Sequence, residues 1–226
     1  MRIAVLGTGM VGQAIAARLD ELGHDVTLGT GNPEATLART ETDGMGNPGV
    51  GVWAAEHPAV TVATFHDAAA ATELVVNATN GAVSLEVLAA AGAENLAGKV
   101  LVDIANPLDF SQGVPPTLFV KDTDSLGEQI QRAFPDARVV KTLNTMNAHL
   151  MADPKQLAEG DHSVFVSGDD AGAKDTVTEL LTSMGHTDVI DLGDISTARG
   201  TEMLLPVWLR LWGALGTPVF NFKIVR

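Results

Sequence analysis

The sequence of 226 residues contains neither cysteine nor tyrosine, and aromatic residues make up only 4% of it. Without cysteine, the chain cannot form disulfides, bind zinc through thiolates or use a thiolate nucleophile. No charged and then apolar leader precedes the first predicted strand, so we expect no secretory signal peptide. Both absences are consistent with a cytoplasmic protein, which is the location we expect.

Cations are also scarce, with 14 Lys and Arg against 28 Asp and Glu and a formal net charge of -14. A chain this acidic repels nucleic acids and anionic membranes, so we expect neither as a partner. The longest apolar stretch, residues 203–215, is interrupted by Pro206 and Arg210 and is shorter than the about 20 residues that a membrane span requires. A phosphorylated small-molecule ligand would need backbone amides, helix ends or a few well-placed cations.

Common catalytic signatures are missing as well. The sequence has no G-x-S-x-G or S-x-x-K nucleophile motif, and its six histidines do not have the spacing of metal ligands. We therefore predict no metal site and no catalytic side chain. Such scarcity is expected of an enzyme in which bound cofactors perform the chemistry and the protein aligns them.

The first twelve residues have the pattern of a dinucleotide-binding turn. An apolar run at residues 3–6 predicts a strand, and an amphipathic helix is predicted after the glycines of a G-x-G-x-x-G motif. In this motif the first glycine allows a tight turn, the second admits a pyrophosphate and the third lets the helix pack closely. The helix N-terminus then points its N–H groups at the phosphates. The predicted cofactor-binding residues here are Gly7, Thr8, Gly9, Met10, Val11 and Gly12.

Short apolar runs alternate with helical segments along the chain, which is typical of a parallel sheet covered on both faces. We predict an α/β fold, with a Rossmann doubly wound parallel sheet at residues 1–146 and a small C-terminal α/β extension at 147–226 that packs on the cleft. The predicted strands are residues 3–6, 24–29, 60–65, 74–77, 100–104, 138–143, 162–166 and 188–192.

Three segments depart from this alternation. Residues 40–59, rich in glycine around Trp53, are predicted to be an extended loop, and residues 106–120 are predicted to be irregular. Residues 197–215 predict one long helix that is apolar nearly all round. Such a helix must be buried, so we expect a core helix or, alternatively, a homodimer face.

Neutral polar residues follow several of the predicted strands. Ligands of doubly wound sheets bind outside the carboxyl ends of the strands, and a nicotinamide carboxamide and a ribose need neutral hydrogen-bond partners. Each residue alone could be an ordinary turn former, but three Asn-containing ends together favour a binding site. The further predicted cofactor-binding residues are Thr30, Gly31, Asn32, Asn77, Ala78, Thr79, Ala105, Asn106, Pro107, Asn144, Thr145 and Met146.

The end of the second strand governs the choice between NAD(H) and NADP(H). NAD enzymes usually place Asp or Glu there, whereas this chain has Thr30 and Gly31, which favours NADP(H). Yet no arginine follows Thr30 directly, and Glu34 adds a negative charge in the next helix. Arg39 lies too far along that helix to be a clear substitute. The residues therefore leave both cofactors open.

Taken together, these stretches resemble the NADPH-dependent oxidoreductases of the deazaflavin coenzyme F420, especially their actinobacterial branch, over nearly the whole chain. The resemblance implies that a hydride moves between the nicotinamide and F420 as co-substrate. It also implies that residues 77–79 and 106–107 lie along the nicotinamide half of the cofactor and that 143–146 lie near the meeting point of the two rings. The stretches that carry it are residues 7–12, 74–79, 98–109, 139–146, 199–206 and 220–223.

The chain departs from this family after the second strand, where such enzymes usually have Ser-Arg or Thr-Arg. The polyanionic tail of F420 also needs basic contacts, which the sequence does not locate. Two other functions stay open. An imine or β-hydroxyacid-type NAD(P) reductase shares the glycine motif but carries a longer helical C-terminal domain. A non-catalytic NAD(P)H sensor would bind the cofactor without transferring a hydride.

Overall fold

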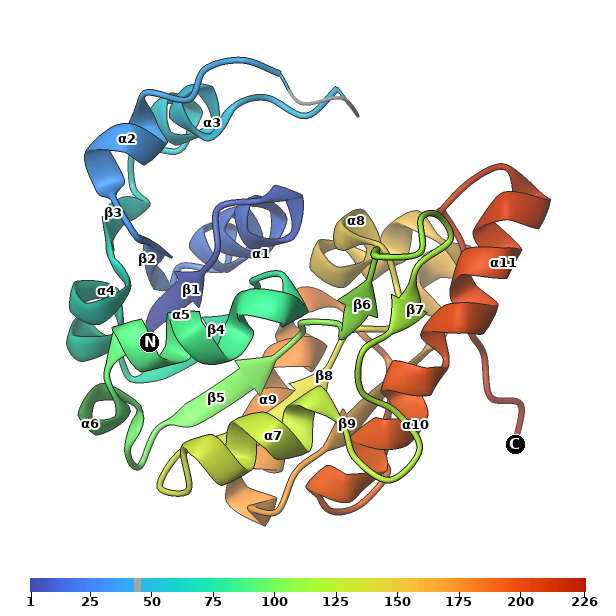
Figure 1. Cartoon of the computed structure of the whole chain (residues 1–226). Helices are drawn as coiled ribbons and strands as arrows, with labels where there is room; N and C mark the ends of the chain where they lie inside the picture. The colour runs from blue at the N-terminus through green and yellow to red at the C-terminus, as the bar shows by residue number, and fades with distance from the viewer. Residues whose placement is uncertain (43–45) are drawn as a thin grey trace.

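One eight-stranded sheet runs through the centre of the molecule (Figure 1). The computed structural model describes residues 1–42 and 46–226. All eight predicted strands of the sheet are present, each within one residue at either end. They are β1 (Arg2–Leu6), β2 (Asp25–Thr30), β3 (Thr61–Thr64), β4 (Leu74–Asn77), β5 (Val100–Asp103), β8 (Arg138–Thr142), β9 (Ser163–Ser167) and β10 (Asp188–Asp191).

The strand order is β10-β9-β8-β5-β4-β1-β2-β3. Six neighbouring strands are parallel, as predicted, namely β3, β2, β1, β4, β5 and β8. By contrast, β9 pairs antiparallel with β8, and β10 runs parallel to β9. An antiparallel neighbour needs no crossover helix that returns the chain to the same edge. The strands of the predicted C-terminal extension therefore continue the same sheet in the opposite direction, and the domain boundary at residue 146 stays a prediction.

Helices cover both faces of the sheet. One apolar cluster joins one face to α1 (Met10–Glu21), α8 (Ala148–Ala152) and α9 (Ala171–Met184). A second cluster joins the other face to α4 (Phe65–Ala71), α5 (Ser84–Ala91), α6 (Ala93–Leu96), α7 (Leu126–Ala133) and α10 (Ala198–Met203). No helix within the described residues is long and apolar enough to cross a bilayer.

The prediction of an extended loop at residues 40–59 is wrong in its second half. After α2 (Pro33–Leu37), the chain forms α3 (Val50–Glu56), in which Val50 and Trp53 lie one turn apart and are buried in the first apolar cluster. Burial of these side chains outweighs the low helix propensity of the glycines there, and the Trp53 ring stacks on His57. Residues 43–45 of the predicted loop lie outside the described residues.

Residues 106–120, predicted to be irregular, contain a short antiparallel pair, β6 (Leu108–Asp109) and β7 (Thr117–Leu118). The predicted helix at 197–215 is divided into the 3-10 turn η4 (Ile195–Thr197), α10 and α11 (Leu205–Leu215), and Pro206 lies in the first turn of α11. Only Leu205 and Trp208 of α11 are buried, so the core-helix expectation is wrong for most of this helix. The remaining 3-10 turns are η1 (Gly81–Val83), η2 (Pro154–Gln156) and η3 (Ala158–Gly160).

Candidate functional site

The strand order reverses direction around β1, which lies between β4 and β2. The chain first moves outward to β2 and β3 and then crosses to β4 on the other side, which leaves a crevice at the carboxyl ends of β1 and β4. The five predicted groups of site residues follow β1, β2, β4, β5 and β8. Because these strands are parallel, the fold brings all five groups to one edge of the sheet.

The glycine turn between β1 and α1 is open on one side and tightly packed on the other. Gly7 has φ +118°, and a Cβ there would lie 2.5 Å from the carbonyl oxygen of Ala78. A Cβ at Gly12 would overlap the carbonyl oxygen of Gly7. Gly9 is exposed, and a Cβ on it would meet no described atom within 4 Å. The turn is therefore packed against the protein at Gly7 and Gly12 but open above Gly9, where a ligand can approach.

Gly9 is also the N-cap of α1, and no described side chain caps this helix. Its first-turn N–H groups and the positive end of its dipole therefore face the open side of the turn. Free backbone donors next to uncrowded space fit a pyrophosphate. Thr8, Met10 and Val11 are partly exposed around this opening.

Arg39 reaches the same turn, which the sequence did not indicate. Its guanidinium donates a hydrogen bond to Thr8 Oγ1 at 2.6 Å. The start of α3 fixes its backbone, because Gly51 N–H donates to the Arg39 carbonyl oxygen at 2.8 Å. A pocket of about 190 Å³ is lined by Thr8, Gly9, Arg39 and Glu41, among others. The missed signal is the break of α2 at Leu37, which lets the chain fold back.

The polar side chains at the end of β2 form hydrogen bonds to other groups of the protein. Thr30 is buried, and its hydroxyl lies 2.7 Å from that of Thr36. Asn32 Oδ1 accepts from Ala35 N–H at 3.0 Å and caps α2. Gly31 is exposed between them. A ligand at this segment would therefore contact its exposed backbone and the nearby side chain of Arg39.

The side chain of Asn77 lies in the floor of the crevice. It is fully buried, donates to Asp103 Oδ1 at 2.8 Å and to Ser84 Oγ at 3.1 Å, and accepts from Thr79 Oγ1 at 2.7 Å. Ala78 and Thr79, which follow it, are partly exposed. Asn77 thus orients the segment that could contact a cofactor.

Asn106 and Asn144 join the ends of β5 and β8. Asn106 Nδ2 donates to the Asn144 carbonyl oxygen at 3.0 Å, and Asn144 Nδ2 donates to Asn106 Oδ1 at 3.1 Å and to the Thr201 carbonyl oxygen at 3.1 Å. Asn106 is partly exposed. The other predicted residues here are buried, namely Ala105, Pro107, Asn144, Thr145 and Met146.

A buried ion cluster beneath these strand ends was not predicted. Lys141 Nζ lies 2.8 Å from Asp103 Oδ2 and 2.9 Å from Glu202 Oε1, and it donates to the Ala105 carbonyl oxygen. Burial alone would lower the pKa of Lys141, but the two carboxylates outweigh it and raise this pKa. Lys141 is therefore a permanent cation within the floor of the site.

The signal for this cluster is a charged residue in the buried part of each of two strands. Asp103 and Lys141 are direct neighbours in the register of β5 and β8. Glu202 comes from α10 and also accepts from Leu126 N–H at 2.8 Å and Gly127 N–H at 3.1 Å, so it caps α7. The cluster thus fastens α10 to the sheet and to α7.

Comparisons with known proteins agree with this geometry. Residues 2–107 match the family model described as NADP oxidoreductase coenzyme F420-dependent. A crystal structure from Arthrobacter sp. FB24, described as a candidate F420-dependent NADP reductase, is 68% identical, covers 100% of both chains and has a TM-score of 0.96.

Two curated relatives are more distant. The F420-dependent NADP reductase of Methanocaldococcus jannaschii is 28% identical over 52% of each chain. Metalloreductase STEAP3 of Rattus norvegicus is 29% identical over 92% of this chain and 38% of its own length, so the chain spans about two fifths of that relative. The full-length match to the Arthrobacter protein and the family model together identify the chain as a member of the coenzyme F420-dependent NADP oxidoreductase family.

Proposed function

We propose that the chain transfers a hydride between NADP(H) and the deazaflavin coenzyme F420. The observation that carries this proposal is the uncapped N-terminus of α1 above Gly9, with the Arg39 guanidinium at its rim. Membership of the F420-dependent family supports the identity of both cofactors. When bound, the dinucleotide would supply or accept the hydride at its nicotinamide ring.

The protein's part in this reaction is binding and orientation. Residues 7–12 hold the pyrophosphate, and residues 30–32 with Arg39 lie at the ribose end. Residues 77–79, 105–107 and 144–146 form the nicotinamide end, where buried amides hold the backbone in place. None of these residues needs to transfer a proton, and orientation of two bound rings is a sufficient source of acceleration.

A direct assay tests the proposal. Purified protein is mixed with oxidised F420 and NADPH, and the visible absorbance of F420 is followed. We expect this absorbance to disappear with NADPH. Binding of NADPH without loss of the band would instead identify a dinucleotide sensor, and turnover of imines but not F420 would identify the alternative reductase.

Arg39 offers a test of cofactor choice. If its guanidinium binds a 2′-phosphate, Arg39→Gln should raise the KM for NADPH roughly tenfold and leave the KM for NADH nearly unchanged. Arg39→Lys, which keeps the charge, should lie between the two. Glu41 lines the same pocket with the opposite charge, so both cofactors must be measured. Tighter binding of NADH than NADPH by the wild-type protein would contradict this role.

We also propose that the chain forms a homodimer through the outer face of α11. Val207 and Leu215 are 50% and 56% exposed on this helix, although an apolar helix is stable only when its face is covered. A second copy of the chain would cover this face.

A further inference from the structure

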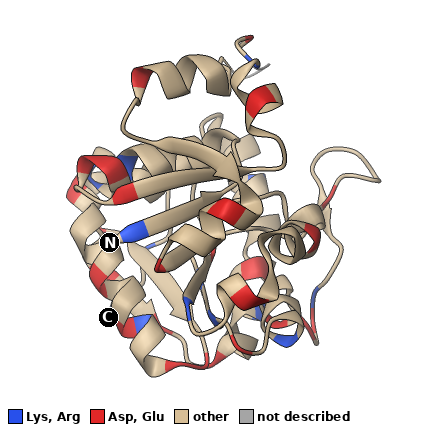
Figure 2. Ribbon diagram, turned by 90° about the vertical axis from the view of Figure 1, so that its left-hand side faces the viewer, with Lys and Arg blue, Asp and Glu red and all other residues tan. Residues whose placement is uncertain are grey.

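The few cations of this chain are almost all bound to protein partners. Figure 2 shows acidic positions spread over the ribbon and few basic ones among them. Eight of the 14 Lys and Arg side chains form ion pairs, and three others donate to described hydroxyl or carbonyl oxygens. Within the described residues only Lys121, Lys155 and Arg210 have no hydrogen-bond or ion-pair partner for their side chains.

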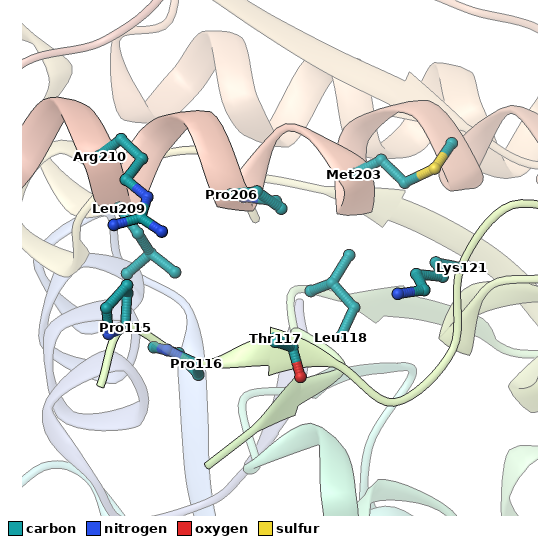
Figure 3. A pocket seen from close by; sticks show the side chains of 9 residues that line it. All are labelled: Pro115, Pro116, Thr117, Leu118, Lys121, Met203, Pro206, Leu209 and Arg210. Atoms are coloured by element: carbon teal, nitrogen blue, oxygen red, sulfur yellow. The ribbon is translucent and has the colours of Figure 1, made fainter. Parts of the chain in front are cut away.

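Two of these three cations line the same groove. A pocket of about 350 Å³ lies between the β7 segment and α10–α11, with Lys121 and Arg210 at its opposite ends (Figure 3). Pro116, Leu118 and Leu209 also line this pocket, and no acidic side chain of the described chain lines it. A second pocket shares Pro115, Leu209 and Arg210 with the first and continues past Arg210.

This groove begins next to the candidate site. Phe119, directly after β7, donates its N–H to the carbonyl oxygen of Pro107 at 3.0 Å. On the other wall, Met203 comes two residues after Thr201, whose carbonyl oxygen accepts from Asn144. Both walls are therefore anchored to the predicted nicotinamide end of the crevice.

An apolar groove with one unpaired cation at each end fits an extended ligand that carries separated anionic groups. In a protein with a net charge of -14, such a groove provides a local exception to the general repulsion of anions. Each cation remains hydrated and available, because no protein carboxylate neutralises it. Because the groove is open to solvent, its two cations stay hydrated. They would contribute to the affinity for the anionic part of the ligand.

We propose that Lys121 and Arg210 bind the polyanionic tail of coenzyme F420 along this groove, while its deazaflavin ring lies at the crevice. This assignment rests on the proposed function, since it assumes that F420 is the hydride partner. It gives the tail the basic contacts that the sequence alone does not locate.

The test compares F420 with the same deazaflavin stripped of its phosphate and carboxylate tail. In Lys121→Gln and Arg210→Gln we expect the KM for F420 to rise roughly tenfold each, with kcat nearly unchanged. The KM for the stripped deazaflavin should remain at the wild-type value, which also reports that each variant is folded. Lys155→Gln is the matched control, because Lys155 is equally unpaired but lies outside the groove.

The outcomes separate the two proposals. If the wild-type protein reduces both deazaflavins but the groove variants keep its KM for F420, the groove assignment is wrong and the hydride-transfer function stands. An equal rise for both deazaflavins also overturns the assignment, since the groove would then act on the ring. If the wild-type protein reduces neither, the proposed function is wrong and the groove assignment falls with it.

Discussion

The charge of Lys141 lies in a buried ion cluster, since its side chain and those of Asp103 and Glu202 are at most 2% exposed. A buried ion pair is not by itself a source of stability, because the desolvation of each charge opposes the attraction between them. The cluster instead fixes the positions of the helices and strands that carry it. It ties β5, β8, α7 and α10 together at one point directly under the strand ends of the candidate site.

Replacement of Lys141 by methionine should therefore be severely destabilising. Lys141→Met leaves two carboxylates buried without their cation, and we expect a loss of about 3–5 kcal/mol in the free energy of unfolding. Urea denaturation measures this loss. The matched variant is Lys223→Met, whose ion pairs with Asp161 and Asp188 are partly exposed, and it should unfold almost as the wild-type protein does. Equal effects of the two substitutions would contradict this account.

His186 makes the stability depend on pH. Burial lowers its pKa from 6.5 to about 4, and its Nδ1 is buried without a partner among the described groups. The unfolded chain therefore binds more protons than the folded chain between these two values, so the free energy of unfolding falls as the pH falls from about 6.5 to 4. This loss amounts to at most about 3 kcal/mol.

Denaturant titrations at several pH values measure the effect of His186. In His186→Gln we expect the decrease between pH 6.5 and 4 to be smaller than in the wild-type protein, by the contribution of this one ring. His66→Gln is the control, because His66 is exposed. If His186→Gln and the wild-type protein lose stability in parallel over this range, the ring is not the cause.

Among the elements, the β1–α1 turn and the strands could be predicted because their signals are local. Gly7, Gly9 and Gly12 specify the turn, and the side chains of Asn32 and Ser125 accept from backbone N–H groups at the start of the helices that follow them. The helix α3, by contrast, is stabilised by the burial of Trp53, which depends on tertiary contacts that the neighbouring sequence does not indicate.

The candidate site likewise has parts that local sequence signals predict and parts that depend on tertiary contacts. The strand ends of the site were predicted, since the topology of a parallel sheet brings them to one edge. Arg39 and the Lys141 cluster were not, because they depend on a chain reversal after α2 and on the register of β5 against β8. Asn77 and Asn144 belong to the predicted set, yet their side chains bind other protein groups. Residue type alone does not distinguish a ligand contact from a support for one.

The glycine turn allows a matched pair of substitutions. In Gly9→Ala the new methyl group meets no described atom within 4 Å, so stability should be nearly unchanged while affinity for NADPH falls at least about tenfold. In Gly12→Ala the methyl group overlaps the Gly7 carbonyl oxygen, so α1 must shift and the free energy of unfolding should drop by about 1–3 kcal/mol.

Thermal unfolding with and without NADPH separates these two effects. Gly9→Ala should unfold at the wild-type temperature without ligand and lose most of the shift that NADPH causes. Gly12→Ala should unfold earlier in both conditions. A wild-type shift in Gly9→Ala would mean that the pyrophosphate does not approach over Gly9.

At the scale of the whole molecule, most residues of α11 are exposed. It projects beyond the sheet at the edge of the molecule in Figure 1, and the apolar side chains on its outer part face solvent. We propose that a second copy of the chain covers this face. The groove at Lys121 and Arg210 uses Pro206 and Leu209 of the same helix, whereas Val207 and Leu215 do not line it.

The proposed homodimer can be tested by measuring the mass of the protein in solution. Leu215→Glu places a charge in the proposed interface and should convert the dimer to a monomer in light scattering at micromolar concentration. Leu37→Glu, on an exposed apolar position of α2, should leave the dimer intact. A monomeric wild-type protein would rule out the dimer, and a dimeric Leu215→Glu would place the interface elsewhere.

The contact of Glu202 with the first turn of α7 joins residues that are 76 positions apart. Protein synthesis proceeds from the N-terminus, and a segment that folds early can complete only those contacts whose partners have already emerged. Until α10 has been synthesised, Lys141 therefore lacks Glu202, and the N–H groups of Leu126 and Gly127 lack the carboxylate that accepts from them. Ribosome-bound chains that stop before residue 202 should remain sensitive to protease around α7, and release of a few more turns of helix should protect them.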